Sequence, residues 1–190
     1  CYATKRFHKF QLSLSGFGMF ARSRFESTRS KMKITSCFLL LAAGSTWKYS
    51  DTGASPGANW ATAEFGDDAW SKGAAQLGYG DRDEATPIDA SKDNYPRYYF
   101  RQQFEVEDPG KLKPLVVRLL KDDGAIVYLN GKEVVRDNMP DGKVTHDTFA
   151  KAATPIEAAS TSTISLRTSW WLGRTSSRWK CIRRMRTRAM

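Results

Sequence analysis

The sequence predicts an all-β protein built as an antiparallel β-sandwich. Short segments rich in β-branched and aromatic residues are separated by turn residues at brief intervals, and no segment carries the 3.6-residue apolar period of an amphipathic helix. The chain has 190 residues, which is enough for one domain with a buried core. These features together favour a sandwich or jelly roll over a mixed α/β fold.

The most explicit strand signals lie in residues 115–136. Asp122-Asp123-Gly124 and Asn130-Gly131 place residues that tolerate positive φ between apolar runs, which is a strong hairpin signal. The expected strands, paired in sequence as a meander, are 115–120, 125–129 and 132–136. The middle strand is apolar or aromatic at every position, so both of its faces are expected to be covered.

Residues 97–106 alternate in the way that a strand does. Tyr98, Phe100, Phe104 and Val106 share one face, and the other face is mostly polar, so this strand is expected to be half buried. Further expected elements are a strand at 47–49, a loop at 53–59 and a short strand at 144–149.

The excess positive charge is confined to the two ends of the chain. The net charge of +10 divides into +7 for residues 1–46, −4 for 47–156 and +7 for 157–190. The segment with the strand patterns is therefore mildly acidic, which argues against a nucleic-acid binder. Residues 1–31 show no sustained period, so we expect a disordered basic flank there. All three cysteines lie in the flanks, at positions 1, 37 and 181, so the central segment has no disulfide framework.

Residues 32–46 have the outline of a secretory signal. Met32-Lys33 is followed by an apolar run that includes Phe38, and small residues end the segment. The run is too short to span a bilayer as a helix, so no transmembrane segment is expected. This interpretation makes Met32 the start of the protein, leaves residues 1–31 as upstream sequence, and places the product outside the cell or in the periplasm and cell envelope. The alternative is a buried apolar strand.

Aromatic residues punctuate a loop that is rich in glycine, alanine and aspartate. They are Trp60, Phe65 and Trp70. Aromatic residues spaced in this way usually plug the end of a β-sandwich, and in a minority of cases they stand exposed as platforms on which sugars stack. We favour the plug, and we retain Trp60 as a candidate platform.

Three carboxylates gather within residues 76–84. Asp81, Asp83 and Glu84 could share a calcium ion through oxygen ligands. The alternative is a solvated acidic loop, which is the commoner arrangement, because a complete ligand loop of the EF-hand type is missing from the sequence.

The sequence shows no catalytic constellation. His8 lies in a flank, and no nucleophile-elbow pattern accompanies His146-Asp147. The histidines and aspartates are not spaced as the ligands of a metal hydrolase, and glycine-rich phosphate loops are missing. Asp122-Asp123 could act as an acid and base pair, but a role in the turn suits them better.

Several motifs occur together in residues 47–150. They are WKY at 47–49, FGDDAW at 65–70, AQLGYGDRDEAT at 75–86, YYFRQQFEV at 98–106 and LLKDDGAIVYLNGKEVVRDNMP at 119–140. This combination resembles the galactose-binding-like jelly-roll module of secreted bacterial multidomain proteins, which is often attached to a metallophosphoesterase or a lamin-tail-like domain. The resemblance implies a galactose-binding-like β-sandwich over residues 47–155, and it specifies the fold better than the ligand.

The resemblance ends at about Pro155. The module should finish with a strand that returns to the sheet, whereas residues 156–190 are basic and show no alternation. Residues from Ser169 onward can be translated back into nucleotides with freely chosen codons. Read in the frame that starts at the third base of the Ser169 codon, these nucleotides encode LVAGENVLAVEVHQA, which is a turn followed by an alternating strand. We therefore expect a frameshift near residue 156, a basic tail outside the fold, and a jelly roll that is incomplete at its carboxyl end.

Three functional hypotheses follow. The first is a non-catalytic accessory module that binds carbohydrate or packs on adjacent domains. The second is the amino-terminal fragment of a secreted hydrolase such as a metallophosphoesterase. A nucleic-acid binder ranks third, because it requires the arginine-rich tail to be genuine. The candidate ligand-binding residues are Trp60, Tyr79, Asp81, Asp83 and Asp123, and the candidate calcium ligands are Asp81, Asp83 and Glu84.

Overall fold

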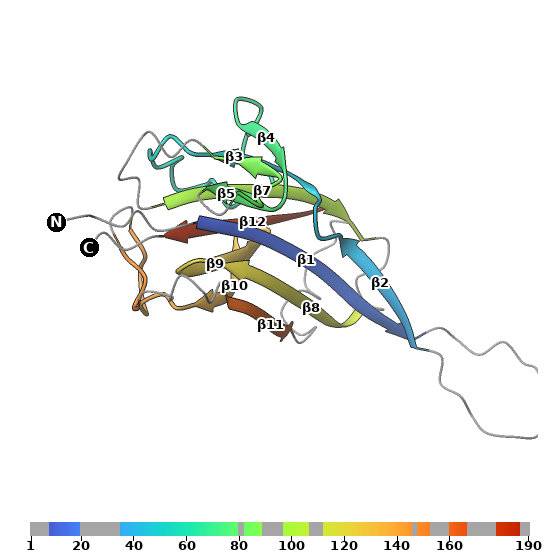
Figure 1. The fold of residues 1–190 in the computed structure, drawn as a ribbon. Coiled ribbons are helices and arrows are strands. Elements are labelled where there is room, and N and C mark those ends of the chain that lie inside the picture. Colours follow the sequence, from blue (N-terminus) through green and yellow to red (C-terminus); the bar gives the residue numbers. More distant parts are fainter. Residues whose placement is uncertain are drawn as a thin grey trace, which may run out of the picture.

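All regular secondary structure in the described part of the chain is β-strand. The computed structural model describes residues 8–19, 35–79, 82–88, 97–106, 112–145, 148–152, 160–166 and 178–186. Within these ranges the expected all-β class is confirmed, and there is no helix long and apolar enough to cross a membrane. The strands form two sheets, which we call sheet A and sheet B (Figure 1).

In the described part of the chain each sheet contains six strands. The spatial order in sheet A is β11 (Ser160–Leu166), β8 (Leu112–Lys121), β1 (His8–Met19), β5 (Leu77–Tyr79) and β6 (Thr86–Pro87), and β2 (Thr35–Leu41) also pairs with β1. The order in sheet B is β10 (Lys132–Asp137), β9 (Gly124–Leu129), β12 (Arg178–Arg186), β7 (Arg97–Glu105), β3 (Thr46–Ser50) and β4 (Ser71–Ala74). Paired strands are antiparallel, except that β5 and β6 run parallel.

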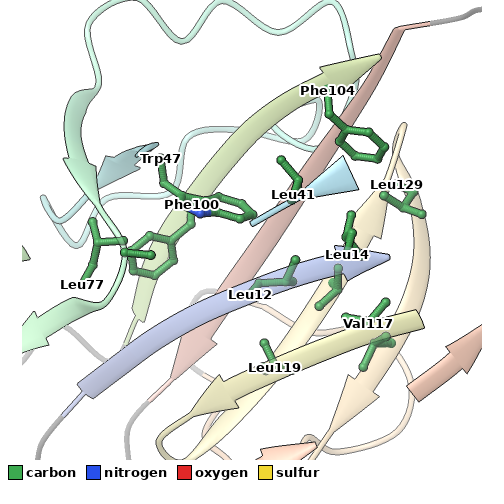
Figure 2. Close-up of a cluster of buried hydrophobic side chains, with 14 of the residues drawn as sticks. Leu12, Leu14, Leu41, Trp47, Leu77, Phe100, Phe104, Val117, Leu119 and Leu129 are labelled. Carbon is green, nitrogen blue, oxygen red and sulfur yellow. The ribbon is translucent and has the colours of Figure 1, made fainter. Parts of the chain in front are cut away.

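One apolar core receives side chains from both sheets. Leu12 and Leu14 of β1 and Leu119 of β8 approach from sheet A, and they meet Trp47 and Phe100 of sheet B (Figure 2). All five are almost fully buried. The alternation of apolar and polar residues in these strands places the apolar set on the inner face of each sheet, where its removal from water stabilises the fold.

Strand β9 is buried on both of its faces, as the sequence predicts. Val127 and Leu129 lie in the core between the sheets, and Ile126 packs on the opposite face with Met139. The turn that follows β9 is the expected hairpin. Asn130-Gly131 adopts positive φ values of 47° and 80° and links β9 to β10.

The expected meander of three paired strands is wrong. Strand β8 belongs to sheet A and β9 to sheet B, so Asp122-Asp123-Gly124 carries the chain from one sheet to the other. Asp122-Asp123-Gly124 does separate two strands, as expected. Turn residues alone do not determine whether the second strand pairs with the first or joins the other sheet. Gly124 is required at this crossing, because a Cβ atom there would lie 2.7 Å from Met139 Sδ and 2.9 Å from the Asn138 oxygen.

Strand β7 is more deeply buried than its alternation suggests. Tyr98 and Phe100 face the core as expected, but Tyr99 and Arg101 on the other face are also buried. The loop over residues 51–70 covers this part of the outer face, so Arg101 lies in an internal ion pair with Asp67, whereas Gln103 and Glu105 on the same face are exposed as expected.

The amino-terminal flank is not wholly disordered, because residues 8–19 form β1 in the middle of sheet A. This strand pairs with β8, β5 and β2. Leu12 and Leu14 are fully buried, whereas Gln11, Ser13 and Ser15 between them are half buried. The two-residue period is therefore present over a short window, and the basic composition of the surrounding residues obscured it.

The apolar run expected to form a signal segment is strand β2, the alternative considered for it. Leu41 is buried in the core, whereas Leu39 is 64% exposed. Secretion itself is not tested by this placement. Residues 20–34, which contain Met32-Lys33, lie outside the described residues.

The basic carboxyl-terminal flank also enters the fold, so the prediction of a tail outside the sheets is wrong for residues 160–166 and 178–186. Residues 160–166 form β11, which pairs with β8. Residues 178–186 form β12, with β7 on one side and β9 on the other. The physical reason is that β7 and β9 both present unpaired backbone groups at this place, and backbone pairing does not depend on side-chain charge. The frameshift stays a prediction. The short strand expected at 144–149 is not seen at 144–145 or 148–149, and 146–147 lie outside the described residues.

Candidate functional site

The loop over residues 51–70 carries the aromatic residues that the sequence analysis singled out. Trp60 is only 8% exposed. Its ring centroid lies 4.8 Å from that of Tyr99 and 5.5 Å from that of Tyr128, both in edge-on geometry. Phe65 and Trp70 pair with each other at 5.8 Å. Trp60 therefore occupies the plug position on the outer face of sheet B, and its ring has little free surface for a sugar to stack on.

Arg101 fastens this loop to the sheet. Its side chain is 1% exposed, and its Nε donates a hydrogen bond of 2.7 Å to Asp67 Oδ2. The terminal nitrogens donate to the backbone oxygens of Trp60, Thr62 and Phe65. The guanidinium carbon also lies 5.0 Å from the centroid of the Phe65 ring. A buried arginine with this set of acceptors loses little of the hydrogen bonding that it had in water.

Asp67 is held between two cations. Lys48 Nζ donates a hydrogen bond of 2.7 Å to Asp67 Oδ1, opposite the bond from Arg101. Burial opposes ionisation of Asp67, but the hydrogen bonds from Lys48 and Arg101 outweigh it, so the pKa of this carboxyl lies below its ordinary value. The hydrogen bond to Asp67 raises the pKa of Lys48. Both pKa directions favour the charged pair at neutral pH.

The sequence analysis missed this network of Lys48, Asp67 and Arg101. Each residue looks like an ordinary exposed charge in its own segment, because the three positions are separated by long stretches of chain. The one local signal is the charged Arg101, which lies among aromatic residues in the same strand. Only the pairing of β3 with β7 makes Lys48 the partner of Arg101 across the sheet.

The second candidate region is the crossing turn with Asp122-Asp123. Asp123 is fully buried, and its backbone oxygen accepts hydrogen bonds from Lys121 Nζ at 3.1 Å and from Asn138 Nδ2 at 3.2 Å. Lys121 also lies 3.5 Å from Asp137 Oδ1. These contacts support the turn role for the two aspartates. Asp123 precedes β9, whereas Trp60 contacts Tyr128 near the end of that strand, so the structure does not bring these two candidates together.

The third candidate region is the connection between β5 and β6. Tyr79, the last residue of β5, is half buried, and its ring centroid lies 6.5 Å from that of Tyr98. Asp83 is exposed and Glu84 is half buried. Asp81 lies outside the described residues, so the calcium triad is not tested. Within the described ranges, no group of three or more histidine, cysteine or acidic residues is placed to hold a metal ion.

Three of the predicted site residues, Tyr79, Asp83 and Glu84, are described, lie in this same connection and have surface that a ligand could reach. Trp60 and Asp123 serve packing and turn geometry instead. No protein family, curated protein or solved structure matches this chain. The site is consequently interpreted from its own chemistry.

Proposed function

We propose that this chain is a non-catalytic accessory module of a secreted protein, with a jelly roll of the galactose-binding-like kind, and that it binds carbohydrate at the connection between β5 and β6. The observation that carries the proposal is the difference in exposure among the candidate residues. Trp60 and Asp123 are buried, whereas Tyr79 is half buried and Asp83 is exposed.

The chemistry of the connection suits a sugar. An aromatic ring offers an apolar face to the C–H groups of a pyranose, and a carboxylate accepts hydrogen bonds from its hydroxyl groups. Leu77 of β5 pairs with Thr86 of β6, so the chain leaves β5 and enters the strand next to it. Tyr79, Asp83 and Glu84 are thereby held at one edge of sheet A.

The test is a binding isotherm on a glycan panel for the full chain and two variants. We expect Asp83→Ala to weaken binding by about tenfold, the loss that one charge-assisted hydrogen bond brings. Asp141→Ala is the matched control, because Asp141 is also an exposed aspartate but lies in a different loop. Equal affinity in both variants would place the sugar elsewhere. If no glycan in the panel binds, packing on an adjacent domain would remain as the role of the module.

A further inference from the structure

Strand β12 fills a slot in the middle of sheet B. It pairs with β7 along residues 97–105 and with β9 along 124–129, so it joins the half β4-β3-β7 to the half β9-β10. The other five strands of the sheet come from residues 46–137, whereas β12 comes from the carboxyl-terminal flank. Whatever strand fills this slot holds sheet B together.

The neighbours of the slot specify which kind of strand fits. Position 183 is level with Phe100 on β7 and Val127 on β9, and both side chains are buried in the core between the sheets. Position 184 is level with Tyr99 and Ile126, which are buried on the outer face of sheet B. Residues directly opposite in an antiparallel pair share a face, and successive residues alternate. At these two positions the slot therefore has apolar surroundings on both faces.

This chain supplies charged residues at those positions. They are Arg183 and Arg184. A segment with apolar residues there would form the same backbone hydrogen bonds. It would also add its side chains to the apolar clusters that contain Phe100, Val127, Tyr99 and Ile126.

We propose that the slot between β7 and β9 is a binding site for an extended peptide segment with apolar residues at the two positions level with Phe100 and Tyr99, and that this segment displaces β12. Main-chain pairing on both sides supplies the affinity, and the buried neighbours on each face supply the selectivity, as in other cases of strand addition to a sheet. This peptide site lies in sheet B and is separate from the sugar site proposed in sheet A.

A synthetic peptide, LVAGENVLAVEVHQA, tests the proposal on the full chain. Its alternating segment can place leucine, alanine and valine at positions 183, 184 and 185. We expect it to bind on the order of tenfold more tightly than a scrambled peptide of the same composition in which the alternation is broken. Displaced β12 should then be cut by trypsin after Arg183 and Arg184, and the probe itself contains no lysine or arginine for trypsin to cut. Equal affinity for both peptides, or binding without any gain in cleavage, would overturn the proposal.

A variant of the chain gives the opposite response. Arg183→Val with Arg184→Val supplies the apolar pair in β12 itself, so the melting temperature should rise and binding of the probe should weaken on the order of tenfold or more. A control variant, Arg118→Val, alters an exposed arginine of β8 and should change neither measurement. An unchanged or lower melting temperature for the double variant would show that the slot does not select apolar residues, and would likewise overturn the proposal.

Discussion

Two neighbouring strands of sheet B carry arginine at positions that are level with different residues. Arg101 on β7 has Asp67 and three backbone oxygens as hydrogen-bond acceptors, all supplied by the loop that covers it. One strand away, positions 183 and 184 of β12 are level with Phe100, Val127, Tyr99 and Ile126, which supply no side-chain charge. The comparison teaches that a covering loop can supply the acceptors that a buried arginine needs, and that backbone pairing by itself supplies none for a side chain.

The largest expected effect is on the arginine with acceptors. Arg101→Met removes the donor to Asp67 Oδ2 and to three backbone oxygens, and it should lower the free energy of unfolding by about 4 kcal/mol. Urea denaturation measures it. The control is Arg118→Met, because Arg118 is exposed on β8 and its replacement should cost less than about 0.5 kcal/mol. Similar losses in the two variants would mean that the acceptors around Arg101 do not matter.

Removing the aromatic plug should have the next largest effect. Trp60→Ala empties the space against Tyr99 and Tyr128, and it should lower the free energy of unfolding by about 3 kcal/mol, as other large-to-small changes do. Denaturation and the glycan assay are run on the same sample at low temperature. A folded variant that has lost sugar binding while keeping its stability would restore Trp60 as a stacking platform.

A smaller effect is expected at Asp67, and it depends on pH. Because the pKa of Asp67 is lowered in the fold, its contribution to stability is complete above the ordinary carboxyl value of about 3.9 and is lost as the pH falls through the lower folded value. Asp67→Asn should therefore cost about 2 kcal/mol at pH 7 and progressively less below pH 4. Unfolding is followed from pH 7 to pH 2. A constant difference between the two proteins over that range would contradict the assigned pKa direction.

The smallest effect is expected for a charge pair in solvent. Asp141 has 92% of its side chain exposed and lies 3.5 Å from Lys151, which is also exposed. Asp141→Ala should change the free energy of unfolding by less than about 0.5 kcal/mol, because solvent screens such pairs. A loss as large as that of Asp67→Asn would show that the contribution of an ion pair to the stability of this protein does not depend on its burial.

The sequence predicts individual strands better than it predicts their partners. Strands β7, β9 and β10 and the Asn130-Gly131 turn follow from alternation and turn chemistry, which are local properties. The crossing at Gly124 and the insertion of β12 depend on which backbone edges meet in space, and local patterns do not contain that information.

The same limit applies to the candidate site. The plug role of Trp60 and the turn role of Asp123 were preferred from their residue types and surroundings, and the structure supports both. The network around Arg101 could not be predicted, because its members are brought together only by the pairing of β3 with β7 and by the loop that covers β7.

Amide hydrogen exchange in the full chain tests most directly the claim that both flanks contribute strands to the centres of the two sheets. Peptide fragments covering 8–19 and 178–186 are followed by mass spectrometry. The structure predicts that both segments exchange much more slowly than an unfolded chain, with 178–186 the less protected because of its arginines. Exchange of 178–186 at the unfolded rate would contradict the place of β12 between β7 and β9, and free exchange of 8–19 would contradict that of β1.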